Sequence, residues 1–122
     1  MPSIPKPSYK RFKPSRKQRG YVTLQTYEKV AERDNYSCVR CGKHARHKDK
    51  HGFYIKTEIA HIINKSQGGT GQASNLAVLC GPKVNSGTCH NWVDETREGK
   101  AWFKEWAKAN LNEKGNYKEL IN

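Results

Sequence analysis

The sequence has no long hydrophobic run, few acidic residues and a single methionine. Only 34% of its 122 residues are hydrophobic, and no apolar stretch approaches the roughly 20 residues that cross a bilayer as a helix. The first 20 residues contain no apolar segment of the kind found in secretory signal peptides. We therefore expect a cytoplasmic protein without a membrane partner.

The shortage of hydrophobic residues also limits the core. The length is that of one domain, and a basic head and a polar loop leave only about 80 residues for the packed part. A domain of that size buries little surface, so a structural metal ion is a natural supplement to its stability.

The shortage of acids leaves a strong positive excess. Lys and Arg outnumber Asp and Glu by 23 to 11, which gives a net charge of +12. Residues 1–20 contain no acid, several prolines and seven cations, and we expect them to form an arm that is disordered without DNA or a tail that only improves solubility. Because no segment combines basic and apolar helix faces, nucleic acid is favoured over a membrane surface as the polyanionic partner.

The hydrophobic pattern predicts a small α+β domain. A first helix is expected from Thr26, as its N-cap, to Arg33, with Tyr27, Val30 and Ala31 on its apolar face. Alternating apolar residues predict a strand at 53–63, and the short apolar run at 76–79 predicts a second strand. The two would pair as an antiparallel hairpin around a glycine-rich loop. Helices are expected at 91–98 and 100–111, with Gly115 as the stop and with Trp102, Phe103 and Trp106 in the core.

Four cysteines flank the predicted hairpin as two pairs, Cys38-x2-Cys41 and Cys80-x8-Cys89. In a reducing compartment they are better metal ligands than disulfides, and four thiolates complete the tetrahedral shell of a structural Zn²⁺. The alternative is three cysteines and one histidine from the loop 43–52. Otherwise we expect its three histidines (His44, His47 and His51) to be solvated. A redox role for Cys38 and Cys41 would leave the second pair unused.

The order of the sequence motifs around these cysteines resembles that of the HNH endonucleases, nucleases of the ββα-metal fold. The resemblance covers residues 33–93. It rests on Cys38-x2-Cys41-Gly42, Glu58-Ile59-Ala60-His61-Ile62-Ile63, Gly68-Gly69-Thr70, Asn75-Leu76, Leu79-Cys80 and Cys89-His90. It implies a ββα-metal (treble-clef-like) domain with flanking helices, organised as an arm (1–20), a nuclease domain (21–99) and a C-terminal helix (100–122).

The resemblance also implies roles for three residues of this sequence. His61 matches the general base, and His90 matches a ligand of a catalytic divalent cation (Mg²⁺, Mn²⁺ or Ni²⁺). Asn75 matches the residue that usually fixes the loop and orients the base, and that in some members binds the metal. A neutral imidazole suits proton abstraction because its pKa lies near working pH. A divalent cation suits stabilisation of charge on a phosphodiester.

One position departs from the family pattern. Many members have Asp or His as a second metal ligand immediately before the base, where this sequence has Ala60. Because alternate residues of a strand share a face, Glu58 lies on the side of Ala60 and is our candidate for the missing ligand.

These observations give two hypotheses. The first is a metal-dependent DNA endonuclease. The sequence around Leu79–Trp92 resembles that of small phage-encoded members of the family. This resemblance suggests a role in genome packaging or recombination beside a terminase in a host cytoplasm. The second is a non-catalytic zinc module that binds nucleic acid or bridges proteins, which Ala60 supports. DNA-sequence preference, oligomeric state and the identity of the catalytic metal do not follow from the sequence.

Overall fold

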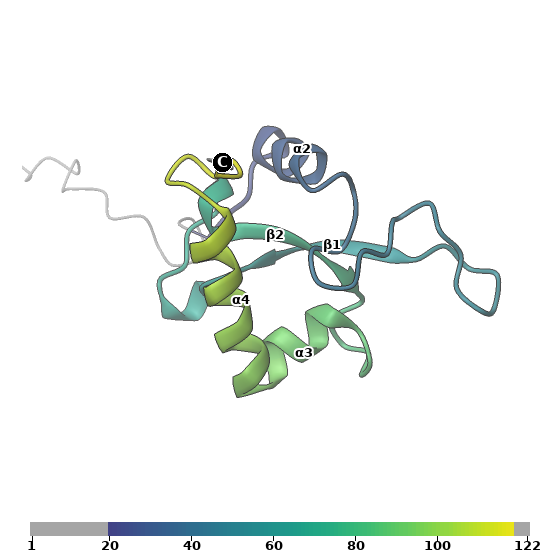
Figure 1. Cartoon of the computed structure of the whole chain (residues 1–122). Helices are drawn as coiled ribbons and strands as arrows, with labels where there is room; N and C mark the ends of the chain where they lie inside the picture. Colours follow the sequence, from purple (N-terminus) through teal and green to yellow (C-terminus); the bar gives the residue numbers. More distant parts are fainter. Residues whose placement is uncertain (1–19, 119–122) are drawn as a thin grey trace, which may run out of the picture.

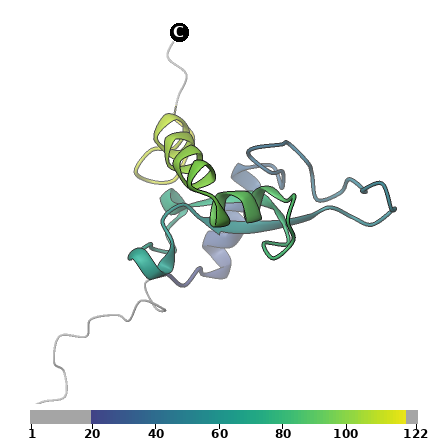
Figure 2. The ribbon, with the colours of Figure 1, turned by 90° about the horizontal axis from the view of Figure 1, so that it is seen from below.

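The computed structural model describes residues 20–118, so the arm expected at residues 1–20 lies outside the described residues except for Gly20. Strands β1 (Lys56–His61) and β2 (Leu76–Gly81) form a two-stranded antiparallel sheet. Helix α2 (Leu24–Arg33) covers one face of the sheet, and helices α3 (Cys89–Glu95) and α4 (Arg97–Asn110) cover the other (Figures 1 and 2). The α+β class and the predicted hairpin are confirmed.

The two faces of the sheet bury separate sets of side chains. Ala60, Ala77 and Leu79 pack with Phe103 toward α3 and α4, whereas Leu76 and Val78 pack toward α2. Strand β2 is therefore covered on both sides, which explains its uninterrupted apolar sequence. The tryptophans of α3 and α4 are partly buried against the first set, as expected for core residues.

Helix α2 begins earlier than predicted. Its N-cap is Thr23 and not Thr26, because the Thr23 hydroxyl accepts a hydrogen bond from the Thr26 amide at 3.1 Å. Val30 and Ala31 are buried as expected, but Tyr27 is 46% exposed and does not join the apolar face. The helix ends at Arg33 as expected, with Asp34 as its C-cap.

A buried ion pair joins the end of α2 to the rest of the fold. Arg33 Nε lies 2.8 Å from Asp34 Oδ1, and both side chains are almost fully buried. Asp34 also accepts from the Val78 amide of β2 and from the Tyr117 hydroxyl. The Arg33 guanidinium donates to the carbonyls of Ala73, Leu76 and Gly115. One polar network thus holds together the end of α2, the chain at Ala73, strand β2 and the C-terminal turn.

The C-terminal helices also differ in their bounds from the prediction. Thr96 separates α3 from α4, and its hydroxyl caps α4 by accepting from the Gly99 amide at 2.9 Å. Helix α4 begins at Arg97 and ends at Asn110, so Gly115 lies beyond it in a turn. The boundary between residues 99 and 100 used for the sequence-based domains therefore falls inside α4.

Strand β1 is shorter than the pattern 53–63 predicted. The chain before it, residues 43–55, projects from the body as a long loop (Figure 1), and Phe53 and Tyr54 in this loop are 71% and 67% exposed. Between β1 and β2 the chain forms two short 3-10 helices, η1 (Lys65–Gln67) and η2 (Ala73–Asn75). Among residues 20–118, no helix is long and apolar enough to cross a membrane.

Candidate functional site

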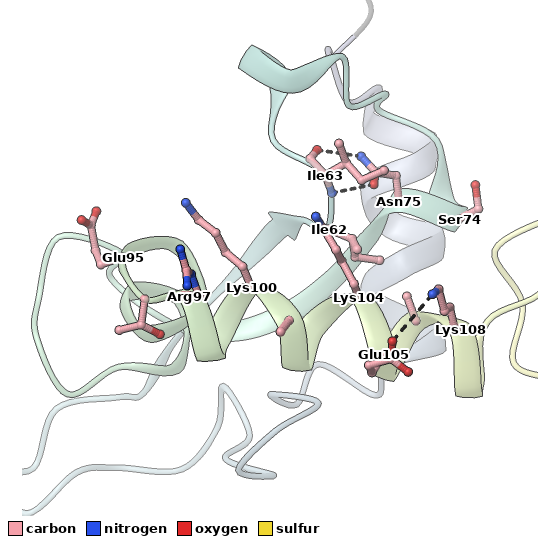
Figure 3. Close-up of a pocket in the computed structure, with 13 residues that line it drawn as sticks. Ile62, Ile63, Ser74, Asn75, Glu95, Arg97, Lys100, Lys104, Glu105 and Lys108 are labelled. Atoms are coloured by element: carbon pink, nitrogen blue, oxygen red, sulfur yellow. Dashed lines mark hydrogen bonds and ion pairs between the residues drawn. The ribbon is translucent and has the colours of Figure 1, made fainter.

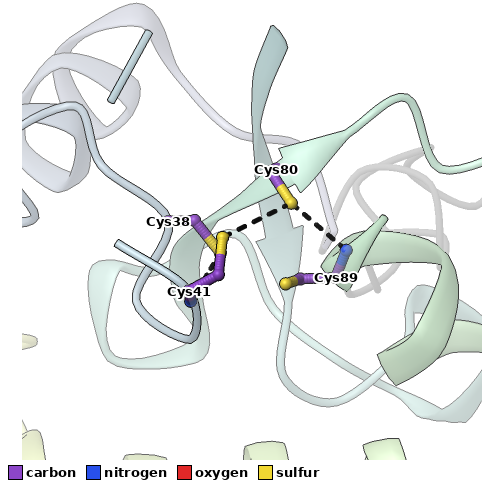
Figure 4. Close-up of side chains that lie close together, drawn as sticks. All are labelled: Cys38, Cys41, Cys80 and Cys89. Carbon is purple, nitrogen blue, oxygen red and sulfur yellow. Dashed lines mark hydrogen bonds between the residues drawn. The ribbon is translucent and has the colours of Figure 1, made fainter. Parts of the chain in front are cut away.

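The four cysteines meet at one point of the fold (Figure 4). Cys38 and Cys41 come from the turn after α2, Cys80 from the end of β2 and Cys89 from the first residue of α3. Their four sulfur atoms all lie within 4.8 Å of one another. The Cys41 and Cys80 sulfurs are 3.8 Å apart, and tetrahedral zinc with bonds of about 2.3 Å separates its sulfur ligands by about 3.8 Å. The four-cysteine prediction is confirmed as a cluster that fits a metal ion such as zinc.

Local geometry explains how distant cysteines converge. Gly42 adopts a φ of 78°, which turns the chain directly after Cys41 and which glycine tolerates at low cost. The long spacing between Cys80 and Cys89 is accommodated because Thr88 folds back and donates to the Pro82 carbonyl at 3.0 Å. The Cys41 and Cys89 amides donate to the sulfurs of Cys38 and Cys80 at 3.5 and 3.3 Å.

The surroundings of the cluster favour negative sulfur atoms. The Arg40 guanidinium lies 3.5 Å from the Cys89 sulfur and 3.9 Å from the centre of the Trp92 ring. Burial nevertheless raises the pKa of the Cys89 thiol, and repulsion from Cys38 adds to this increase. Four thiolates therefore require a cation among them to coexist. The loop histidines do not belong to this cluster.

A second polar site lies beside β1 and α3. A cavity of about 460 Å³ is lined by residues from β1, from the segment after it, from the loop before α3 and from α3 itself. Both histidines at the motif positions line it, together with charged and polar residues that the sequence analysis did not single out. The lining includes His61, Asn64, Lys65, Lys83, His90 and Asp94.

His61, at the last position of β1, is oriented by main-chain contact. Its Nε2 lies 2.8 Å from the Gly20 carbonyl oxygen. A carbonyl only accepts, so Nε2 carries the proton and Nδ1 of the neutral ring is left as an acceptor. Burial lowers the pKa of His61 below its ordinary value of 6.5, with the Lys65 charge acting in the same direction. His61 is therefore neutral at neutral pH.

His90, on the first turn of α3, is oriented by Glu58. Its Nδ1 lies 2.8 Å from Glu58 Oε1, which also accepts from the Lys83 amide at 2.9 Å. Partial burial alone would raise the pKa of Glu58, but the hydrogen bond and charge of His90 and the Lys83 amide hold that pKa below its usual value. With Nδ1 engaged, Nε2 is the ring nitrogen of His90 that remains for another partner.

Asp94 is a residue that sequence reasoning missed. It follows His90 by four positions on α3, so the two side chains lie on the same helix face and line the same cavity. Its Oδ2 lies 2.7 Å from Lys83 Nζ, and this pairing raises the pKa of Lys83. The i, i+4 spacing of His and Asp was the signal in the sequence that could have found it.

Asn75 does not line this cavity, and its side chain is hydrogen-bonded to the backbone. Its Oδ1 accepts from the Ile63 amide at 2.8 Å, and its Nδ2 donates to the carbonyls of Ile63 and Thr70 at 3.1 and 2.8 Å. The side chain is nearly buried and fixes the chain that immediately follows His61. Ala60, in contrast, is 1% exposed within the core and contributes no ligand atom.

The comparisons with known proteins agree with this geometry. A family model described as HNH endonuclease matches residues 38–91, a segment that contains all four cysteines and both motif histidines. No curated protein matches the chain. The cysteine cluster, the antiparallel strands and α3 form the ββα arrangement of that family, and the chain therefore contains an HNH endonuclease domain.

Proposed function

We propose that this protein is a metal-dependent DNA endonuclease that hydrolyses phosphodiester bonds, with His61 as the general base. The observation that carries the proposal is the cavity that places neutral His61 beside His90 and Asp94. Phosphodiester hydrolysis needs a proton acceptor for the attacking water and a positive centre at the phosphate. The HNH match supports nuclease chemistry, and the net charge of +12 supports a nucleic-acid substrate.

The cavity residues fit a divalent cation. His90 has Nε2 available because Glu58 occupies Nδ1, and the Asp94 carboxylate already has the Lys83 ammonium as a cationic neighbour in the cavity. One imidazole and one carboxylate, completed by water, suit Mn²⁺ or Ni²⁺ and admit Mg²⁺. When bound, the cation would stabilise negative charge on the phosphate.

In this proposal the carboxylates of Asp94 and Glu58 have different roles. Asp94 takes the ligand position that Ala60 cannot fill. Glu58, which the sequence suggested as that ligand, instead orients the His90 ring by accepting a hydrogen bond from its Nδ1–H, as carboxylates commonly do for metal-binding histidines. Asn75 is a positioning residue, because its side chain binds the backbone of Ile63, two residues after His61, and of Thr70 in the following loop.

His61 would carry the proton transfer. Its Nδ1 accepts the proton of the attacking water while the Gly20 carbonyl keeps Nε2 protonated and the ring in place. The imidazolium that forms is held between Gly20 and the cavity, where the Asp94 charge favours it. The leaving oxygen departs with positive charge from Lys65 and Lys83 nearby.

The test is nicking of supercoiled plasmid by the purified protein with Mg²⁺, Mn²⁺ or Ni²⁺. We expect cleavage by the wild type and a loss of at least about 100-fold in His61→Ala, since general-base catalysis contributes typically that much. His51→Ala, which removes an exposed histidine that does not line the cavity, is the matched control and should cleave normally. A His61→Ala variant as active as the control would refute the assignment of the base.

A second candidate function is a non-catalytic zinc module that binds nucleic acid. It is favoured by Ala60 and by the finding that, within residues 20–118, only the four cysteines form a cluster of three or more metal-ligating side chains. A wild type that binds DNA and remains inert with every cation would establish this second function.

A further inference from the structure

A groove lined by cations lies next to the catalytic cavity. Its volume is about 780 Å³, and it runs between α4 and the chain on either side of Asn75 (Figure 3). Four exposed cations of α4 line it, spaced by three or four residues so that they form one stripe along the helix: Arg97, Lys100, Lys104 and Lys108. Figure 3 shows Lys100 and Lys104 extending from α4 on the side that faces Ile62 and Ile63.

The charge of this stripe is largely unneutralised. Lys108 lies 3.6 Å from Glu105, but both side chains are mostly exposed, so the pairing is weak. Among the described residues, Arg97, Lys100 and Lys104 form no ion pair. Like charges on one helix face destabilise the helix slightly, so their clustering is not explained by stability.

The groove and the cavity share a wall. Residues 61–64 separate the two, because His61 and Asn64 line the cavity whereas Ile62 and Ile63 line the groove. On α3, Asp94 lines the cavity and the next residue, Glu95, lines the groove. This shared wall gives a DNA strand with one phosphate beside His61 a path toward the α4 stripe.

We infer that the stripe of Arg97, Lys100, Lys104 and Lys108 binds the phosphate backbone of the DNA strand that enters the catalytic cavity. The inference rests on the proposed function, because it takes the cavity as the site of cleavage. The exposed Ile63 and the apolar floor of the groove suit the sugar edge of the strand, and the ammonium groups suit its phosphates. Helix α4 lies outside the matched segment 38–91, so its role belongs to this chain's own residues.

The test measures binding of a 30-base-pair DNA duplex of arbitrary sequence over a range of salt concentrations, with no added divalent ion. The variant is Lys100→Ala with Lys104→Ala, at exposed helix positions where alanine keeps the helix. The charge-matched control is Lys29→Ala with Lys114→Ala, which removes two exposed lysines near the end of α2 and the C-terminal turn. Both double variants lower the net charge equally.

If the stripe binds phosphates, the salt slope of binding falls by about two in the variant and stays near the wild-type value in the control. Two phosphate contacts correspond to about a tenfold change in affinity between 50 and 200 mM salt. Cleavage by the variant should show a raised KM with kcat close to that of the wild type.

Two outcomes separate this inference from the proposed function. Equal slopes in the variant and the control, with a cleaving wild type, would overturn the inference and leave the nuclease standing. A lower slope in the variant, with a wild type that cleaves in no cation, would uphold the stripe as a DNA-binding surface and remove the nuclease.

Discussion

His61 illustrates how a single residue acquires its role from its surroundings. Histidine is a common solvated residue in this chain, and the three loop histidines remain on or near the surface. His61 differs because the Gly20 carbonyl fixes its tautomer and burial disfavours its protonated form. Position in the motif identified the residue, but only packing makes it a neutral acceptor.

The lowered pKa of His61 predicts the pH dependence of cleavage. A base works only when unprotonated, so cleavage should decline as pH falls and His61 gains its proton, and the midpoint of this decline should lie below pH 6.5. The measurement is the single-turnover rate at saturating Mn²⁺, which keeps metal binding complete across the range. A rate that already halves above pH 6.5 would contradict a burial-depressed base.

Glu58 gives a second prediction at this scale. A Cβ at Gly81 would overlap the Glu58 carboxylate, so Gly81→Ala should displace that carboxylate from His90 with little effect on the core. We expect the Mn²⁺ concentration for half-maximal cleavage to rise about 10- to 100-fold, both in this variant and in Glu58→Gln. Glu28→Gln, an exposed carboxylate on α2, is the control. An unchanged Mn²⁺ requirement in both variants would exclude orientation of His90 by Glu58.

Among the structural elements, α2 depends on one buried ion pair for its position. The apolar face of this helix supplies few fully buried side chains, chiefly Val30 and Ala31. Arg33 and Asp34 add hydrogen bonds to β2, to the carbonyl of Ala73 in η2 and to the C-terminal turn. Since the Gly20 carbonyl that orients His61 comes shortly before α2, the placement of this helix bears on the cavity that His61 lines.

Removal of Asp34 should therefore destabilise the whole domain. Asp34→Ala leaves Arg33 buried without its counter-charge, and we expect a loss of about 3–5 kcal/mol in the free energy of unfolding. Tyr117→Phe removes one donor to Asp34 and should cost about 1 kcal/mol. Urea denaturation measures both, with exposed Glu32→Ala as the control. A loss below 1 kcal/mol for Asp34→Ala would mean that the network adds no stability.

The whole molecule is organised around the cysteine cluster. The cluster joins the turn after α2, the end of β2 and the start of α3, which are far apart in the sequence. His90 directly follows Cys89, so the cluster also fixes the position of His90 in the cavity that it lines with His61. A chain with so small a core depends on such a junction for a unique structure.

The cluster predicts the metal content of the protein. We expect one zinc ion per chain by elemental analysis, less than half of that in Cys89→Ser, and a cooperative loss of helical signal when a chelator removes the ion. His47→Ala should keep a full equivalent, because the loop histidine lies outside the cluster. A full equivalent of zinc in Cys89→Ser, lost in His47→Ala, would favour the three-cysteine alternative.

The sequence was sufficient for features that depend on local pattern. The alternation around Ala60 and the apolar run around Val78 predicted the hairpin, because strand patterns can be read along the chain. The paired cysteines predicted the cluster, and their order along the chain with the motif histidines predicted the HNH family. The roles of His61, Asn75 and His90 and the domain boundaries stay predictions.

Only the tertiary structure decided which distant groups meet. Glu58 contacts His90, which lies 32 positions further along the chain, and Asp94 lines the same cavity as His90. The Gly20 carbonyl contacts His61 across 41 positions of the chain. The helix bounds in the structure differ from the predicted ones for a similar reason. Thr23 and Thr96 are the N-caps because of their side-chain geometry, which composition does not specify. Periodicity fixes the face on which a side chain lies, whereas its partner depends on how the elements pack.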